Sequence, residues 1–164
     1  MTMNRKEVTK VLTEAASHYF ITKMFSVFYE FGVGYRGQRR LDLLCLNPKM
    51  DFIGVEVKSC KLDYTTDSKW LEYLPFTNKL YLMIPPSLMA SDFYQQILAD
   101  TKPHGIGIMS LTEYGNVYVV QNAKYREIDD LVCGRLLMKM AWRGGQSRRN
   151  TRITNRRPRF VLEN

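Results

Sequence analysis

Two short apolar runs, residues 41–46 and 52–58, constrain the fold of this chain more than any other feature of its sequence. Each run holds one acidic residue, Asp42 in the first and Glu56 in the second. An ionised carboxylate that leaves water without a partner costs several kcal/mol, so each acid needs a partner if its run is buried. Both runs have the length and apolar content of β-strands, and the turn-like segment between them predicts a hairpin.

The side-chain period of a strand places Glu56 and Lys58 together on one face, because successive side chains point to opposite faces. Val55 and Val57 then lie on the other face. If the neighbouring strand brings Asp42 to the polar face, two carboxylates and one ammonium converge, which suits Mg²⁺ or Mn²⁺ bound beside a phosphate. The alternative is an ordinary surface ion network, which contributes less than about 1 kcal/mol.

Three segments that follow one another in the chain favour the metal site. Residues 38–44 read Gln-Arg-Arg-Leu-Asp-Leu-Leu, residues 55–59 read Val-Glu-Val-Lys-Ser, and residues 67–73 read Asp-Ser-Lys-Trp-Leu-Glu-Tyr. Together they resemble the MmcB-like DNA repair proteins, which belong to the PD-(D/E)XK nuclease superfamily, and the resemblance runs from about Phe28 to Trp142. It implies an α/β fold with a restriction-endonuclease-like core, in which helices flank a mixed central β-sheet.

The resemblance also implies a set of catalytic residues. Asp42 matches the aspartate of the motif, Glu56 its second acid and Lys58 its lysine, whereas Leu41 stands where the motif has its proline. The expected metal ligands are Asp42, Glu56 and the backbone carbonyl of Val57. Lys58 is expected to orient or help activate the attacking water and to offset the charge that develops on phosphorus.

A further glutamate serves as a ligand in many members of the superfamily, and both Glu14 and Glu30 are available. Glu30 is preferred because it is again an acid within an apolar run, residues 26–31. The alternative for Glu30 is a strand residue that simply faces solvent.

Hydrophobic periodicity predicts the element order αβββαβαββα. The predicted ranges are helices over 5–19, 86–98 and 127–142, strands over 24–33, 39–46, 52–59, 79–85, 105–111 and 116–120, and a short helix that starts from an N-cap within 65–67 and ends at Pro75. In the short helix, the spacing of Trp70 and Tyr73 favours core packing over base stacking. Lys69 is expected to point towards the face of Glu56 and Lys58, where contact with phosphate and a plain surface position both remain open.

Positive charge is concentrated at one end of the chain. Residues 1–142 carry 17 Lys and Arg against 15 Asp and Glu, whereas residues 143–164 carry seven Arg against Glu163. We therefore expect a nuclease-like domain over 1–142 and a basic, flexible tail over 143–164, for which a solvated tail that aids solubility is the alternative. Side chains of both parts are expected to bind nucleic-acid phosphates. They are Arg39, Arg40, Lys61 and Lys69 in the domain and Arg148, Arg149, Arg152, Arg156 and Arg157 in the tail.

Several other classes of protein are excluded by composition. No apolar stretch approaches the ~20 residues of a membrane span, and the first residues lack the apolar core of a signal peptide. This predicts a cytoplasmic, nucleoid-associated protein without a membrane partner. The three cysteines and two histidines lack the spacing of a disulfide framework or a zinc site.

The function expected from the sequence is a metal-dependent DNA nuclease of repair or recombination. One alternative is a protein that keeps the nuclease fold but binds DNA or recruits a repair partner without cutting. A further alternative is a basic RNA-binding protein in which the tail dominates and the acids are incidental. Cutting both strands of a duplex would favour a homodimer with two-fold symmetry.

Overall fold

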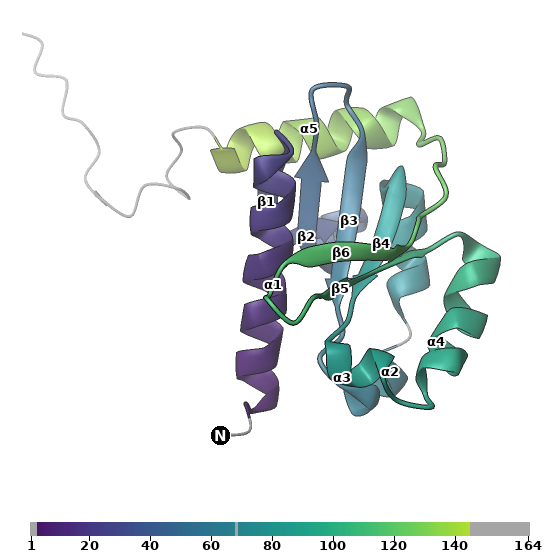
Figure 1. Ribbon diagram of the computed structural model, residues 1–164. Helices are drawn as coiled ribbons and strands as arrows, with labels where there is room; N and C mark the ends of the chain where they lie inside the picture. Colours follow the sequence, from purple (N-terminus) through teal and green to yellow (C-terminus); the bar gives the residue numbers. More distant parts are fainter. Residues whose placement is uncertain (1–2, 68, 145–164) are drawn as a thin grey trace, which may run out of the picture. The chain divides into compact units, whose positions relative to one another are not determined.

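Six β-strands form a sheet in sequential order in a computed structural model that describes residues 3–67 and 69–144 (Figure 1). The strands are β1 (Ser26–Val33), β2 (Arg39–Leu46), β3 (Phe52–Val57), β4 (Lys79–Met83), β5 (Gly107–Leu111) and β6 (Val117–Gln121). The pairs β3–β4 and β4–β5 are parallel, and the other three pairs are antiparallel. The prediction of an α/β fold with a mixed sheet is confirmed, as is the hairpin predicted from residues 41–46 and 52–58.

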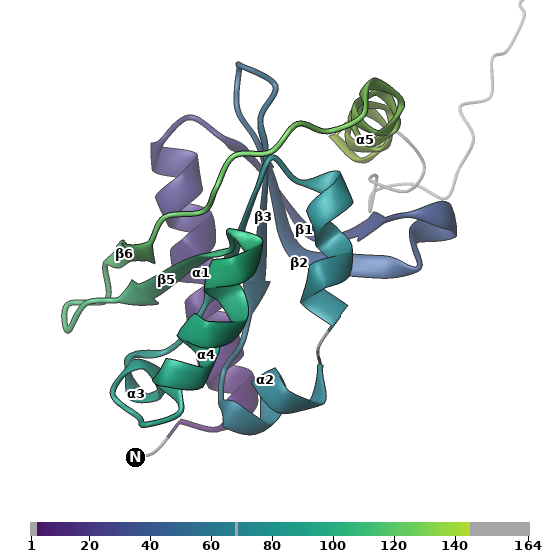
Figure 2. The same ribbon diagram turned by 90° about the vertical axis from the view of Figure 1, so that its right-hand side faces the viewer.

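Helices follow the strands in the expected order. The α-helices are α1 (Arg5–Thr22), α2 (Lys61–Thr66), α3 (Pro86–Met89), α4 (Tyr94–Thr101) and α5 (Asp130–Gly144), and the 3₁₀ helices are η1 (Tyr35–Gly37), η2 (Lys69–Phe76) and η3 (Lys102–His104). Figure 2 shows α1 and η2 on opposite sides of the central strands. Helices therefore cover both faces of the parallel part of the sheet, as parallel strands require.

Helix α1 supplies the apolar core on its face of the sheet. Its first turn is closed by a capping box, in which Asn4 Oδ1 accepts from the Glu7 backbone N–H at 3.1 Å and Glu7 Oε2 accepts from the Asn4 N–H at 2.8 Å. The buried residues Leu12, Ala16 and Phe20 follow at four-residue spacing and so share one side of the helix. They pack with buried sheet residues Leu43, Cys45, Ile53, Val55, Val57, Tyr81, Met83 and Met109.

The opposite face of the sheet is covered by the crossover between β3 and β4, which contains α2 and η2. Trp70 and Tyr73 of η2 are each only 5% exposed, so the prediction of core packing for both is confirmed. The Tyr73 hydroxyl donates a hydrogen bond of 2.8 Å to the backbone carbonyl of Arg40, which ties η2 to β2. This crossover is what closes the polar side of β3.

Several predicted helix boundaries differ from the structure. Residues 65 and 66 end α2 rather than cap the next helix, and Pro75 lies inside η2. The single helix expected over 86–98 is two helices, α3 and α4, and between them the Ser91 hydroxyl donates to the Leu88 carbonyl at 2.6 Å. A serine side chain that takes a backbone acceptor in this way favours a turn over a continued helix. The helix expected over 127–142 spans Asp130–Gly144.

The described residues divide into two compact units, one ending at Asp129 and one beginning at Asp130 with α5. The expected domain of residues 1–142 and tail of 143–164 stay a prediction, because everything after residue 144 lies outside the described residues. No helix within 3–67 and 69–144 has the length and hydropathy needed to cross a membrane.

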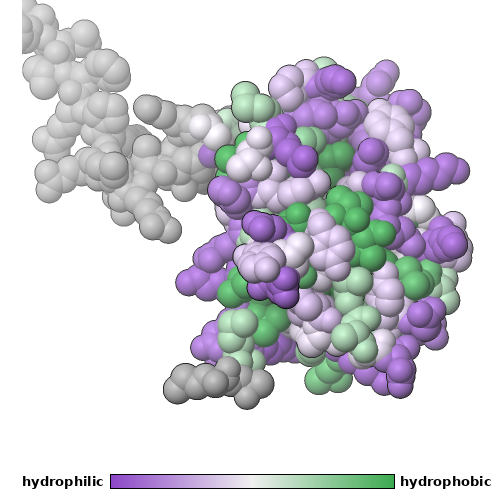
Figure 3. Space-filling view, in the orientation of Figure 1, coloured by the Kyte–Doolittle hydropathy of each residue, from purple (hydrophilic) through white to green (hydrophobic). Residues whose placement is uncertain are grey.

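Hydrophobic residues form several separate patches among hydrophilic ones on the face of the first unit that Figure 3 shows. Strand β6 is an edge strand, and Val117 and Val119 are only half-buried where they pack against the core under α1. This edge lies at the opposite end of the strand order from β1, β2 and β3.

Candidate active site

The candidate site lies where β2 and β3 separate. The last paired residues of the two strands are Leu43 and Val55. One residue further, Asp42 Oδ2 accepts a hydrogen bond of 2.7 Å from the backbone N–H of Val57. The Asp42 side chain thus accepts the hydrogen bond that a backbone carbonyl of β2 would otherwise accept, and the two strands separate beside Glu56. The N–H and C=O of one strand residue point to the same side, so the carbonyl of Val57 is also directed towards Asp42.

Glu56 is buried with half of its carboxylate unsatisfied. The residue is 5% exposed, and its Oε1 lies 3.4 Å from Lys58 Nζ. Its Oε2 is buried and has no hydrogen-bond partner among the described residues. Burial raises the pKa of Glu56 to about 8, and the negative charge of Asp42 adds to the shift. A buried oxygen of this kind favours a cation as its partner.

Lys58 is held by two carboxylates from different elements. Its side chain is 1% exposed, and Nζ donates to Asp67 Oδ2 at 2.9 Å and to Glu56 Oε1 at 3.4 Å. Burial acts to lower the pKa of Lys58, but the hydrogen bond to Asp67 and the charge of Glu56 outweigh it, so the pKa is raised. The ammonium is therefore charged and fixed in position. The prediction that Glu56 and Lys58 share a face is confirmed, and the surface-network alternative is excluded by their burial.

Asp67 is the residue that sequence reasoning did not assign to the site. It was expected to cap a helix, and its Oδ1 does accept from the Lys69 N–H at 3.2 Å, but its Oδ2 reaches Lys58. Burial opposes ionisation of Asp67, yet the hydrogen bond and charge of Lys58 prevail and its pKa is lowered. The only signal in the sequence was its place at the start of the third resemblance segment.

A second carboxylate, Asp63 of α2, fixes the chain just after β3. Its Oδ2 accepts from the Ser59 N–H at 3.0 Å and from the Ser59 hydroxyl at 2.9 Å, and its Oδ1 lies 2.5 Å from Arg5 Nη2. Desolvation is the main effect that raises the pKa of Asp42, and the charges of Asp63 and Glu30 contribute to it. The site is thus an acidic environment around one buried ammonium.

Glu30 lies in the same cross-strand row as Asp42. The neighbouring pairs are Tyr29 with Leu43 and Phe31 with Leu41, which places Glu30 opposite Asp42. Its backbone has φ +46°, its side chain is 69% exposed, and Oε1 lies 3.7 Å from Arg40 Nη2. Within residues 3–67 and 69–144, no three His, Cys, Asp or Glu side chains form a cluster that could hold a metal. A ligand role for Glu30 stays a prediction.

The basic residues expected to bind phosphate are arranged unevenly. Arg39 pairs with Glu72 and Arg40 lies near Glu30, so both have carboxylates close by. Lys61 lies 4.8 Å from the centroid of the Phe93 ring, and Lys69 is exposed. The tail residues Arg148, Arg149, Arg152, Arg156 and Arg157 lie outside the described residues.

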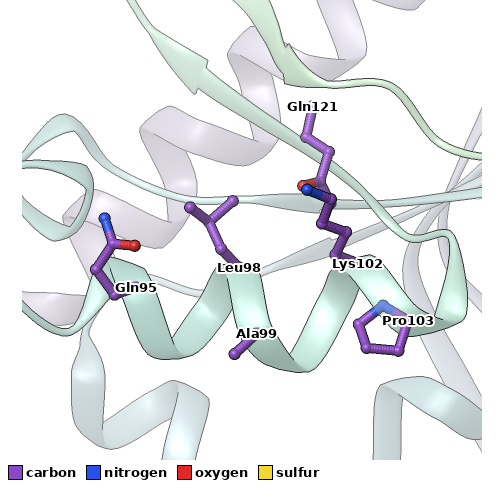
Figure 4. A pocket seen from close by; sticks show the side chains of 6 residues that line it. All are labelled: Gln95, Leu98, Ala99, Lys102, Pro103 and Gln121. Atoms are coloured by element: carbon purple, nitrogen blue, oxygen red, sulfur yellow. The ribbon is translucent and has the colours of Figure 1, made fainter.

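A surface pocket of about 530 Å³ lies away from these residues, beside α4 (Figure 4). It is lined by Gln95, Leu98, Ala99, Lys102, Pro103 and Gln121. None of these side chains is an acid, a histidine, a serine or a cysteine, and the Lys102 amine is the one ionisable group in the lining. The chemistry of the first unit is concentrated at Asp42, Glu56 and Lys58.

Comparison with known proteins gives one family and several structural neighbours. A model of the family described as DNA repair protein MmcB-like matches residues 2–126. A protein of unknown function from Silicibacter pomeroyi has the same fold, with 20% identity, 86% of each chain covered and a TM-score of 0.66. No curated protein matches.

Two more distant structures are less similar. An fdxN element excision controlling factor protein from Anabaena variabilis is 15% identical over 68% of this chain and 95% of its own, with a TM-score of 0.48. An XisH family protein from Nostoc punctiforme is 15% identical over 71% of this chain and 99% of its own, with a TM-score of 0.44.

Proposed function

Because the chain belongs to the MmcB-like family of DNA repair proteins, we propose that it is a metal-dependent nuclease that hydrolyses phosphodiester bonds in DNA. One observation carries the proposal: a buried carboxylate oxygen, Glu56 Oε2, lacks a partner among the described residues beside a buried, charged Lys58. Burial of these charges does not favour stability. A functional role therefore explains better why Glu56 and Lys58 are buried.

The residues at the strand separation fit a hard divalent cation. Asp42, Glu56 and the carbonyl of Val57 are the oxygen donors that would hold Mg²⁺ or Mn²⁺, which prefer such ligands. The unsatisfied Oε2 and the raised pKa of Glu56 both indicate a carboxylate that gains from a cation. When bound, the ion supplies Lewis-acid polarisation of the scissile phosphate.

Lys58 is the residue that acts on the reacting groups from the protein side. Its ammonium offsets the charge that develops on phosphorus and orients the attacking water. Asp67 holds Nζ at 2.9 Å, which fixes its position before substrate arrives and reduces the reorganisation needed during the reaction. Asp42 and Glu56 attract the cation. Without a cation, both carboxylates would repel a phosphate.

A protein that only binds DNA would not benefit from this arrangement. Two acids beside a phosphate repel it, so they weaken binding unless a cation lies between them. The same argument applies to an RNA-binding protein that relies on a basic tail. Binding without cleavage, and cutting of RNA in place of DNA, are therefore outcomes that the experiment must separate.

The test is cleavage of labelled DNA and RNA substrates, single-stranded, duplex, flapped and branched, with Mg²⁺ or Mn²⁺. Asp42→Asn and Glu56→Gln should each lower the cleavage rate at least ~100-fold, since both remove a charge that the metal needs. Glu113→Gln, which changes an exposed acid in the β5–β6 turn, is the matched control and should cut like the unchanged chain. Equal cleavage by all four proteins would refute the site.

Metal binding gives a second readout that does not depend on substrate. Titration calorimetry with Mn²⁺ should detect binding to the unchanged chain and to Glu113→Gln but not to Glu56→Gln. Affinity should rise with pH from 6 to 9, because the cation competes with the proton on Glu56, whose pKa is about 8. Mn²⁺ binding that is the same in Glu56→Gln would place the metal elsewhere.

A further inference from the structure

The loop that joins β1 to β2, residues 34–38, lies at the same end of the sheet as the candidate site. Strand β2 begins at Arg39, and Asp42 is three residues further on. At about 3.3 Å per residue, the near end of the loop, at Gln38, lies ~13 Å beyond Asp42. A nucleic-acid strand that places a phosphate at Asp42 would therefore pass within reach of this loop.

The loop has a defined backbone conformation, which its own residues and hydrogen bonds fix. Gly34, Arg36 and Gly37 all adopt left-handed conformations, with φ of +77°, +55° and +67°. The Gly37 N–H donates to the Gly34 carbonyl and the Gln38 N–H to the Tyr35 carbonyl, both at 3.2 Å. Glycine adopts such angles freely, whereas for arginine they are unfavourable, so Arg36 is held at this position by the turn around it.

The loop presents an aromatic ring and a cation to solvent. Tyr35 is 72% exposed, and the Arg36 guanidinium lies 5.1 Å from the centroid of its ring. No carboxylate pairs with Arg36 among the residues that the structure describes, whereas Arg39 and Arg40 each have one nearby. Arg36 is therefore the arginine of this hairpin whose charge is most available, although it was not among the residues expected to bind phosphate.

We propose that this loop binds an unpaired stretch of nucleic acid next to the scissile phosphate, with Tyr35 stacking on a base and Arg36 contacting a backbone phosphate. An aromatic face and an adjacent cation are the two elements by which proteins hold single strands. In a duplex the bases are already stacked on one another, so Tyr35 has no base to accept. The inference deepens the proposed function and rests on it: it makes substrates with unpaired nucleotides beside the cut the preferred class.

The test is the affinity for a labelled single strand and for the matching duplex, measured with Asp42→Asn as background so that no cleavage occurs. Tyr35→Ala should weaken single-strand binding ~5- to 100-fold and leave duplex binding almost unchanged. Tyr35→Trp should retain single-strand binding, and Tyr35→Leu, which is apolar but not planar, should not. Arg36→Gln should weaken binding and reduce the dependence of affinity on salt by about one phosphate contact.

The matched control is Tyr114→Ala. Tyr114 is 83% exposed and, like Tyr35, lies next to a glycine with a positive φ in a hairpin turn, but that turn joins β5 to β6. Single-strand affinities of Tyr35→Ala and Tyr114→Ala that agree within about twofold would overturn the inference, as would an unchanged chain that binds neither form of DNA. If the chain binds single strands through Tyr35 but never cleaves, the loop is a single-strand binding site and the proposed nuclease function fails.

Discussion

The two sides of strand β3 are equally buried but opposite in chemistry. Val55 and Val57, 0% and 4% exposed, pack into the apolar core under α1, whereas Glu56 and Lys58, 5% and 1% exposed, lie among carboxylates. An apolar side stabilises the fold by removing hydrocarbon from water, but a charged side does so only when every charge is paired. Burial alone therefore does not distinguish an apolar core from a functional site. The unsatisfied oxygen of Glu56 is the feature that distinguishes them.

Leu43→Ala should cause the largest loss of stability, because it breaks the apolar side. Leu43 is fully buried under α1, and its truncation leaves a cavity that lowers the free energy of unfolding by ~2–5 kcal/mol. Urea unfolding measures this loss. Leu62→Ala, at an exposed leucine of α2, is the control and should change stability by less than about 0.5 kcal/mol. A loss below about 0.5 kcal/mol in Leu43→Ala would contradict the assignment of Leu43 to the core.

Asp67→Asn should have the next largest effect, on catalysis rather than on folding. It keeps a hydrogen-bond acceptor for Lys58 but removes the charge that holds Nζ, so we expect kcat to fall ~10- to 100-fold with little change in KM. Asp67→Glu, which restores the charge, should recover part of the rate. Steady-state cleavage kinetics decide this, and an equal loss in Asp67→Asn and Asp67→Glu would indicate a steric role only.

Glu56→Gln should stabilise the metal-free protein, and more so at high pH. Burial, with the charge of Asp42, raises the folded pKa of Glu56 from 4.5 to about 8. Folding therefore favours the protonated form of Glu56. The contribution of Glu56 to stability is complete below pH about 4.5 and is lost as the pH rises through about 8, because the folded state must then hold an ionised Glu56. Thermal melts with chelator at pH 5, 7 and 9 should show the variant gaining over the unchanged chain, with ~2–4 °C in Tm for each kcal/mol. Two curves that stay parallel across this range would contradict the raised pKa.

Glu30→Gln should have the smallest effect. The side chain is 69% exposed and its contact with Arg40 is long, so stability should change by less than about 0.5 kcal/mol. If Glu30 is an accessory ligand, Mn²⁺ affinity in calorimetry should fall by up to about tenfold, far less than in Glu56→Gln. An unchanged affinity would assign Glu30 to the solvent-facing alternative.

Local pattern was enough to predict the hairpin and the shared face of Glu56 and Lys58. The predicted range of β2 is confirmed, and β3 ends at Val57, two residues earlier than expected. These features depend on the two-residue period of a strand and on turn residues close in sequence, so they can be read without knowledge of the rest of the chain. The break between α3 and α4 was missed because the apolar residues of this region still fit a helix, and the hydrogen bond of the Ser91 hydroxyl to the Leu88 carbonyl leaves no mark on that pattern.

The amino-acid sequence by itself determined which charges are placed among apolar residues and on which face of β3 they lie. Only the tertiary structure decided that Asp67 comes back to Lys58, that Asp42 takes the N–H of Val57, and that Glu56 Oε2 is left without a partner among the described residues. The physical reason is that these contacts are made across the sheet and by the crossover that covers it. Their existence depends on how separate elements pack in space, which no local period specifies.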